Sequence, residues 1–540
     1  MRRADRRWFR HLLRRESGGT LDLDTPLLAL SKQDGFTIRD ACQNVLYTGG
    51  IGSGKTTSAK TLLGGLLRAR AGGIVLCAKA EEAQHIREQC ALHGRSDSLV
   101  EFDASGRHGF NFIAYELARL GSGGIGSVIE CIMRVLEMMR LASPSPGKVG
   151  DAFWESTTRQ ILRNAFPVMF AAHGTVTIAM LLQFVRSAPR SPEEMADRAW
   201  QDQSFFALCF AMAQANGMDP AQWQQAVDYW RNDFATLDAK TRGNVVLTLT
   251  TALDRFSHGW LADAFCGVTT LTPELTFSGA IILLNMPALT LNEDGIVAQQ
   301  IFKFFWQRAV LTRNMLGTAL SERLVFCWCD ECQYFVNSQD AEFLSTSRGA
   351  RSCTVFLTQS LPTLMAKMPG ENARERVFHL LGNFGTKIWC SNACAETNEW
   401  AARTVGRTVQ RRHSYNEGQG SNRSHGMNMG EGSNWGSNSS HGGSYSSGPN
   451  GSGSSSSSWN VGSSHGGNES WGRNRGGGTN HSTSHGYSEQ MDYLIEPAEF
   501  GRMLKTGGPA NGNRVSAVWY QAGRAFASSG GPAMLVEFQQ

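Results

Sequence analysis

The sequence is poor in charge and in cysteine for its length. Charged residues make up 18% of the 540 residues, and the 12 cysteines are too dilute for a disulfide scaffold. The longest apolar stretches, residues 161–182 and 280–291, are interrupted by Arg163 and His173 or are too short to cross a membrane. No apolar segment follows the basic beginning of the chain, which argues against a signal peptide. These absences predict a soluble protein without a transmembrane segment, in a reducing, cytoplasmic setting.

Glycine is abundant instead, and much of it lies in one segment. Residues 414–487 contain 19 of the 59 Gly, together with 21 Ser and almost no aliphatic side chains. Such a segment cannot bury enough apolar surface to offset the entropy lost on ordering. Composition therefore predicts a disordered Ser/Gly-rich insert, whereas a hydrophobic content of 41% excludes a chain that is disordered throughout.

The net charge of +4 also has a local origin. Residues 1–15 carry seven Arg and one Asp, or +6, so the other residues sum to +4 − 6 = −2. The arm has apolar residues spaced to share one helical face, namely Trp8, Phe9, Leu12 and Leu13. One interpretation is an arm that contacts the inner membrane peripherally or binds nucleic acid. The other is a solvated terminal helix without a specific role. The overall basicity gives no evidence for a DNA-binding body.

Periodicity predicts a parallel sheet near the beginning of the chain. Residues 27–31 and 36–38 flank a turn and are expected to form a hairpin. A buried strand at 44–48, a helix at 55–71 and a second strand at 73–77 then form a βαβ unit. Later strand patterns occur at residues 280–285, 324–329, 354–358, 515–521 and 534–538. Because helical periodicity dominates between the strands before residue 111 and those after residue 275, we expect a helical domain to interrupt the sheet.

The strongest motif, G-x-x-x-x-G-K-T, begins at Gly49, directly after the predicted strand. Its glycines let backbone N–H groups surround phosphates at a helix N-terminus. Lys55 is expected to bridge the β- and γ-phosphates of ATP, and the Thr56 hydroxyl to bind Mg²⁺. The expected nucleotide-binding residues are Gly49, Gly50, Ile51, Gly52, Ser53, Gly54, Lys55, Thr56 and Thr57.

A second strand ends in the acidic pair Asp330-Glu331. Asp330 is expected to hold Mg²⁺ through water, and Glu331 to act as the general base toward the attacking water. The strand at 354–358 ends in Gln359, which is placed to contact the γ-phosphate or that water. Two arginines before that strand, Arg348 and Arg351, fit either an arginine finger in a neighbouring subunit or surface salt bridges.

Three cysteines lie in the same stretch, Cys327, Cys329 and Cys332. No second Cys/His pair lies nearby at zinc spacing, so we interpret them as core residues.

Together these patterns predict an α/β protein with a RecA-like P-loop NTPase fold, a mostly parallel sheet and an inserted all-α domain. The predicted segments are a basic arm (1–20), the first part of the NTPase domain (21–110), the all-α domain (111–275), the second part of the NTPase domain (276–413), the Ser/Gly-rich insert (414–488) and C-terminal strands that complete the NTPase domain (489–540).

Further motifs carry a resemblance to a known family. Residues 75–81 keep Lys79 and Glu81 of an Asp-Pro-Lys-Gly-Glu pattern but lose its Asp and Pro. The other matches are Asn111-Phe112, Phe153-Trp154-Glu155 and the run from Arg351 to Gln359. With the P-loop, they resemble the TraG/TraD-like coupling ATPases of type IV secretion and conjugative DNA transfer, in the FtsK/HerA superfamily.

The resemblance implies a homo-hexameric ring with ATP and Mg²⁺ at its subunit interfaces and DNA, bound without sequence specificity, in a central channel. It also implies that the helical domain recognises a relaxase or other cargo, and that the partners of the chain are a relaxase or secretion-channel proteins. Family members usually begin with two membrane-spanning helices, where this sequence has the arginine-rich arm. The expected function is an ATP-hydrolysing DNA translocase that delivers DNA or nucleoprotein to a type IV secretion channel. The alternatives are a soluble DNA motor for processing or defence and a nucleotide-gated adaptor without translocation.

Overall fold

The computed structural model describes most of the chain. The described residues are 22–120, 124–142, 151–316, 318–368, 372–421, 432–447, 453–468 and 479–540. The basic arm lies outside them. The chain divides into two units, Met1–Thr397 with Phe500–Gln540, and Asn398–Glu499. Each is described by itself.

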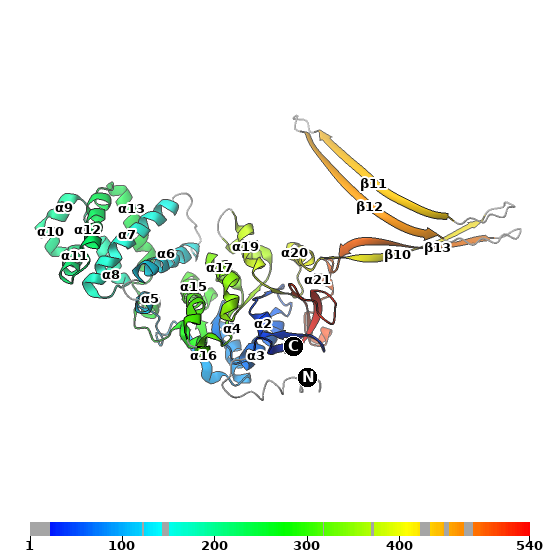
Figure 1. Ribbon diagram of the computed structural model, residues 1–540, viewed down its shortest axis with the longest axis horizontal. Helices are drawn as coiled ribbons and strands as arrows, with labels where there is room; N and C mark the ends of the chain where they lie inside the picture. The colour runs from blue at the N-terminus through cyan, green and yellow to red at the C-terminus, as the bar shows by residue number, and fades with distance from the viewer. Residues whose placement is uncertain are drawn as a thin grey trace. The chain divides into compact units, whose positions relative to one another are not determined.

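A nine-stranded sheet forms the centre of the first unit (Figure 1). Seven neighbouring strands are parallel, and the two from the end of the chain pair antiparallel at one edge. This confirms the α/β class and the mostly parallel sheet. In order across the sheet the strands are β15 (Ala533–Gln539), β14 (Arg514–Gln521), β9 (Thr386–Trp389), β3 (Val45–Thr48), β8 (Ser352–Thr358), β7 (Val325–Cys329), β4 (Gly72–Leu76), β6 (Ile281–Asn285) and β5 (Leu99–Asp103).

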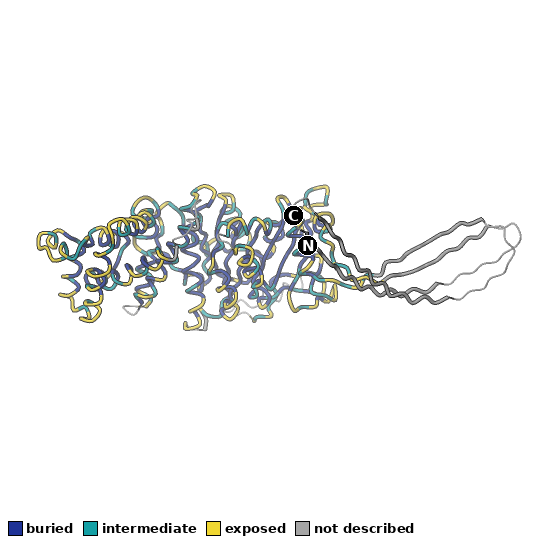
Figure 2. Tube along the Cα trace, turned by 90° about the horizontal axis from the view of Figure 1, so that it is seen from above, coloured by how far each residue is buried: buried dark blue, intermediate teal, exposed yellow. Residues whose placement is uncertain are grey.

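Helices cover both faces of the sheet, which explains why its central strands are apolar throughout rather than alternating. On one face, Phe326 and Trp328 of β7 join the core that includes helices α3 (Lys55–Arg68) and α4 (Ala80–Leu92). The long helix α15 (Ala288–Thr312) lies on the other face, where rings of Phe102 and Phe302 are 5.7 Å apart. In Figure 2 the buried residues, in dark blue, run through the interior, and the exposed ones, in yellow, lie mainly at the periphery.

Shorter elements surround the sheet. The predicted hairpin is present as β1 (Pro26–Ala29) and β2 (Gly35–Thr37), which pair antiparallel. Two helices cross the boundaries between the units: α20 (Ala395–Val405) and α21 (Glu499–Arg502). The remaining helices of the first unit are α2 (Ile38–Ala41), α16 (Thr318–Ser321), α17 (Ser338–Thr346), α18 (Leu361–Lys367) and α19 (Ala373–Gly382).

In the sequence, ten of the described helices follow β5 and precede β6. They pack around aromatic side chains. Trp230 is fully buried there, and its ring centroid lies 5.5 Å from that of Phe184 and 5.2 Å from that of Phe206. The helices are α5 (Phe112–Leu120), α6 (Ile125–Ala142), α7 (Asp151–His173), α8 (Ile178–Arg186), α9 (Pro192–Ala196), α10 (Arg198–Gln203), α11 (Phe205–Ala215), α12 (Pro220–Asp228), α13 (Ala239–Asp254) and α14 (Gly259–Cys266). We call them the helical region.

None of the helices that the structure describes is long and apolar enough to cross a bilayer alone. The segments Phe153–His173 and Ile178–Arg186 reach the necessary length and composition only together, and they are bent by 115°.

The second unit differs from the disorder that its composition predicts. Its strand β10 (Arg407–Ser421) pairs antiparallel with β13 (Thr479–Tyr493), and β11 (Gly432–Ser447) pairs with β12 (Gly453–Asn468). Antiparallel ladders satisfy backbone N–H and C=O groups whatever the side chains are. The composition argument counts only side-chain burial, so it does not register this backbone pairing.

Candidate nucleotide-binding site

The P-loop joins β3 to α3 and adopts a conformation that requires glycine. Gly52 and Gly54 have φ angles of +71° and +79°. A Cβ on Gly54 would lie 2.4 Å from Cγ2 of Val515 in β14, so a side chain there is excluded by contact as well as by strain. Lys55 follows as the first residue of α3 and is buried. Because α3 begins directly after the P-loop, the unpaired backbone N–H groups of its first turn lie next to the loop.

Contacts with the neighbouring strand fix the loop. The N–H of Gly50 donates to the carbonyl of Ser391, just after β9, at 2.9 Å. Below the loop, the Ser58 hydroxyl donates to the Lys55 carbonyl at 2.8 Å and lies 3.5 Å from Cys390 Sγ. The conformation that surrounds the phosphates is thus held by packing from β9 and β14.

The acidic pair lies at the carboxyl end of β7, as the sequence predicts. Glu331 has a left-handed backbone with a φ of +48°, and its N–H donates to Asp330 Oδ1 at 2.9 Å. Burial raises the pKa of Asp330, although the charge of Lys55 opposes that shift. Burial also acts to raise the pKa of Glu331, but a hydrogen bond from Gln333 and nearby lysine charges outweigh it and lower that pKa. Glu331 is therefore held as a carboxylate.

Three side chains donate to the Glu331 carboxylate. Lys79 Nζ lies 3.1 Å from Oε1, and Gln333 Nε2 lies 2.9 Å from Oε2. Gln359 Nε2 lies 3.3 and 3.4 Å from the two oxygens. The Gln333 amide oxygen in turn accepts from the Thr358 hydroxyl at 3.1 Å. The structure thus brings Gln359 to the acidic pair, where its amide contacts the glutamate.

Several of these groups line one cavity of about 400 Å³, whereas Gly49 and Asp330 are not among its lining residues. Its P-loop side is formed by most of the residues that the motif predicts, and its other side by Glu331 and Gln359 from the sheet. The lining residues are Gly50, Ile51, Gly52, Ser53, Gly54, Lys55, Thr56, Thr57, Lys79, Glu331, Gln359, Thr506 and Gln540.

Arg348 and Arg351 lie elsewhere. Both precede β8, whereas Gln359 follows its other end, and the seven residues of that strand span about 23 Å. Arg348 is exposed, and Arg351 donates to the Glu322 carbonyl at 3.1 Å. The structure therefore does not bring them to the nucleotide cavity of their own chain, and action on a neighbouring subunit stays a prediction.

Sequence reasoning missed several residues of the site. Among them is Glu82, whose Oε2 accepts the Ala78 N–H at 2.7 Å; burial and the nearby Asp330 charge raise its pKa to about 8. Glu81, which the motif comparison retained, is exposed. Lys79, Thr506 and Gln540 were also not assigned to the cavity. For Lys79 a signal existed, because it follows a buried strand just as the acidic pair does.

The cysteines of this region belong to the core, as predicted. Cys327, Cys329 and Cys332 are fully buried, and burial raises the pKa of each thiol. In the part of the chain that the structure describes, no group of three or more His, Cys, Asp or Glu residues could hold a metal ion by itself.

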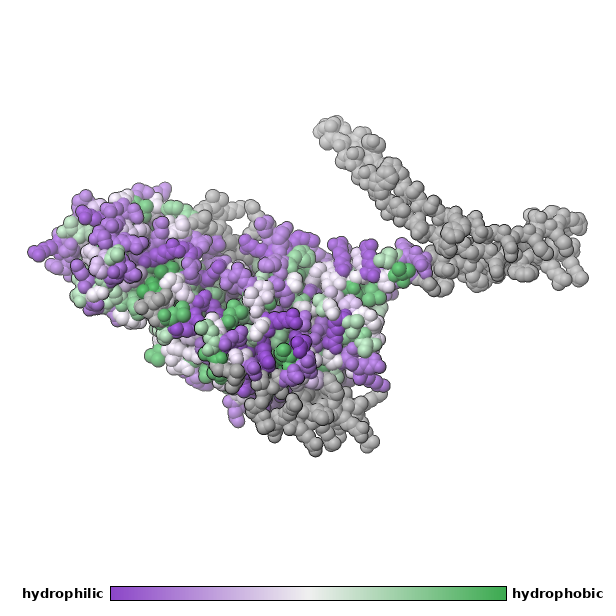
Figure 3. Space-filling view, viewed as in Figure 1, coloured by the Kyte–Doolittle hydropathy of each residue, from purple (hydrophilic) through white to green (hydrophobic). Residues whose placement is uncertain are grey.

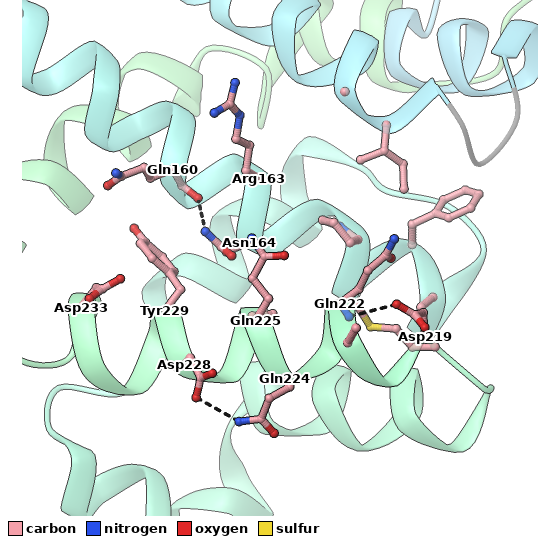
Figure 4. A pocket seen from close by; sticks show the side chains of 18 of the residues that line it. Gln160, Arg163, Asn164, Asp219, Gln222, Gln224, Gln225, Asp228, Tyr229 and Asp233 are labelled. Atoms are coloured by element: carbon pink, nitrogen blue, oxygen red, sulfur yellow. Dashed lines mark hydrogen bonds between the residues drawn. The ribbon is translucent and has the colours of Figure 1, made fainter.

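A larger cavity of about 1360 Å³ lies in the helical region (Figure 4). We call it the helical groove; α7 and α12 line it with the turn of helix after α12. Its lining combines amides and the acids Asp219, Asp228 and Asp233 with apolar residues and Arg163. Hydrophilic residues predominate over the helical region on the face seen in Figure 3. The described residues that line the groove include no P-loop, strand end or group of ligands that would support phosphate chemistry.

The nucleotide cavity defines the class of protein. A P-loop after β3, an Asp-Glu pair after β7 and a glutamine after the intervening β8 are the arrangement of a P-loop NTPase. The chain is such an NTPase by fold and site.

Comparisons with known proteins find similarity to conjugative coupling proteins. Residues 324–447 match a family model described as the TraM recognition site of TraD and TraG. The fold matches the bacterial conjugative coupling protein TrwB in an unbound form, with a TM-score of 0.51, 12% identity, and coverage of 98% of this chain and 91% of that chain. These findings confirm the predicted resemblance to coupling ATPases and the fold class.

Weaker structural matches include TrwB in complex with ADP and Mg²⁺ (TM-score 0.48, 13% identity, covering 93% of this chain and 86% of that one). VirB4 of Thermoanaerobacter pseudethanolicus also matches (TM-score 0.40, 13% identity, covering 68% and 85%). The sequence has no significant match among curated proteins.

Proposed function

We propose that the chain is an ATP-hydrolysing DNA translocase, a coupling protein that delivers DNA or nucleoprotein to a type IV secretion channel. The observation that carries the proposal is the cavity in which Lys55 and Glu331 meet, in a chain with the coupling-protein fold. A nucleotide switch needs the P-loop but not a base, so Glu331 favours hydrolysis over a pure adaptor.

The cavity fits a nucleotide and Mg²⁺. The cavity of about 400 Å³ is lined by Gly50, Gly52 and Lys55, so there is open space beside the loop. Lys55 and the P-loop N–H groups would bind the phosphates, and Thr56 and Asp330 would bind Mg²⁺. When bound, Mg²⁺ neutralises charge that develops on the phosphate oxygens.

Hydrogen bonds from neighbouring side chains orient Glu331 for its proposed role as general base. Its carboxylate accepts hydrogen bonds from Lys79, Gln333 and Gln359, which fix its orientation at the border of the cavity. A base held in this way accepts a proton from water without first reorganising. Gln359 joins the base to the end of β8 and is placed to report a change at the phosphates to that strand.

Partners follow from the same proposal. A relaxosome protein is the protein partner that the family-model description suggests for residues 324–447. DNA would be bound through phosphates in the channel of a homo-hexamer. Arg348 or Arg351 would act on the nucleotide of a neighbouring subunit, and residues 1–15 would contact the inner membrane peripherally.

ATP turnover with and without DNA tests the function. We expect the full chain to hydrolyse ATP, with turnover stimulated by single- or double-stranded DNA and with a hexamer seen by mass photometry in ATP. Turnover that no nucleic acid stimulates would favour the adaptor. If DNA stimulates turnover, fractionation with membranes before and after deletion of residues 1–15 separates a secretion coupler from a soluble motor.

A further inference from the structure

A second lysine in the nucleotide cavity has no role in the general P-loop mechanism. Lys79 follows β4, lies at the N-cap of α4 and lines the same cavity as Lys55. Its side chain is 45% exposed, whereas that of its partner Glu331 is only 7% exposed. The ammonium therefore lies at the border between a buried carboxylate and the open cavity.

The order of the sheet places Lys79 opposite the P-loop. In the order β3-β8-β7-β4, the P-loop and Lys79 follow strands that are three spacings apart, or about 14 Å. Glu331 follows β7 and lies between them. A phosphate chain bound at the P-loop must direct its terminal phosphate toward the base that activates the attacking water. The terminal phosphate is thus the one that comes closest to Lys79.

The contact with Glu331 leaves Lys79 able to bind a second oxygen. Its Nζ donates to Glu331 Oε1 at 3.1 Å, while the other donors to this carboxylate in the described structure, Gln333 and Gln359, are neutral amides. An ammonium group has three N–H donors. One of them can hold the carboxylate while another binds a phosphate oxygen.

We propose that Lys79 is the residue by which this site distinguishes a nucleoside triphosphate from a diphosphate. Its ammonium binds the terminal phosphate and at the same time positions Glu331 beside it. A diphosphate at the same P-loop lacks the group that reaches Lys79. The inference rests on the proposed function, because it requires a nucleotide bound at Lys55.

Equilibrium binding of fluorescent ATPγS and ADP to the full chain tests the proposal. We expect Lys79→Met to weaken ATPγS binding about tenfold, as for loss of a charge-assisted hydrogen bond, and to change ADP binding less than about twofold. Lys79→Arg keeps the charge and should retain most of the preference. Lys60→Met is the matched control, because Lys60 lies on α3 but does not line the cavity.

Equal loss of affinity for both nucleotides, or no loss for either, would overturn the assignment. Thermal unfolding shows whether Lys79→Met is folded; if it is not, Lys79→Gln replaces it, and a retained triphosphate preference in that variant also overturns the proposal. Binding is read without hydrolysis or DNA. Failure of this inference is therefore distinct from failure of the translocase proposal, which shows as turnover that DNA does not stimulate.

Discussion

The nucleotide cavity and the helical groove differ in how they are built. The nucleotide cavity is the smaller, at about 400 Å³ against 1360 Å³, and its walls come from segments as far apart in sequence as Lys55 and Gln540. Its backbone is constrained by contacts such as that of Gly54 with Val515. The helical groove includes exposed polar side chains such as Gln224 and Asp228 of α12, and the Gln224 amide donates to Asp228 Oδ1 at 2.9 Å.

The volume of a cavity therefore does not indicate whether it can carry out a reaction. In the nucleotide cavity, a hydrogen bond from Gln333 and nearby lysine charges lower the pKa of the buried Glu331 carboxyl, so it is ionised and can accept a hydrogen bond from water. The groove offers surface for a partner but holds no such group among its described residues. We therefore expect the two cavities to respond very differently to substitution.

The largest expected effect comes from Lys55→Ala. Removing the ammonium that binds the β- and γ-phosphates should lower ATP turnover about 10³-fold. Steady-state phosphate release with and without DNA measures this effect. Turnover that survives the substitution would show that the P-loop is not the hydrolytic site, and the contrast between the two cavities would then lose its basis.

Glu331→Gln should lower turnover about 10²-fold and leave ATP binding nearly intact. The amide keeps the size of the side chain and can still accept from Lys79, but it cannot take a proton from water. Single-turnover hydrolysis, compared with binding of fluorescent ATPγS, separates the two properties. Equal losses in binding and hydrolysis would mean that Glu331 has a structural role.

The constrained backbone of the nucleotide cavity can be tested by stability. Gly54→Ala combines a φ of +79° with a Cβ 2.4 Å from Val515, so we expect it to lower the free energy of unfolding by about 3 kcal/mol. Gly52→Ala is the control: it shares a positive φ of +71° but meets no atom within 4 Å, and should lose only about 1 kcal/mol. Denaturant unfolding measures both. Equal losses would show that contact with β14 does not constrain the loop.

The sequence predicted those parts of the fold and site that depend on local pattern. The P-loop is contiguous, so its motif places Lys55 and Thr56 without knowledge of the rest of the chain. The predicted buried strands agree with β3, β4 and β7 to within one or two residues, because parallel strands covered on both faces are apolar runs.

Contacts between distant segments could not be predicted in the same way. The partners of Glu331 come from β4, β8 and its own turn, and the order of strands that joins them is not encoded in any local pattern. Strands β5 and β9 were missed; β5 is only partly buried, and β9 has the sequence Thr-Lys-Ile-Trp, which is not an apolar run. The hairpins of the second unit depend on backbone pairing, which composition does not reveal.

The smallest expected effect comes from the helical groove. The double substitution Asp228→Asn with Asp233→Asn removes two exposed negative charges and keeps side-chain size, so the free energy of unfolding should change by less than about 0.5 kcal/mol. Basal ATP turnover should stay within about twofold of the original value, because neither residue lines the nucleotide cavity. Turnover and unfolding are measured on the same preparation. A tenfold fall in basal turnover without loss of stability would show that the groove is coupled to the nucleotide cavity, and the two regions would then have to be treated as one functional site.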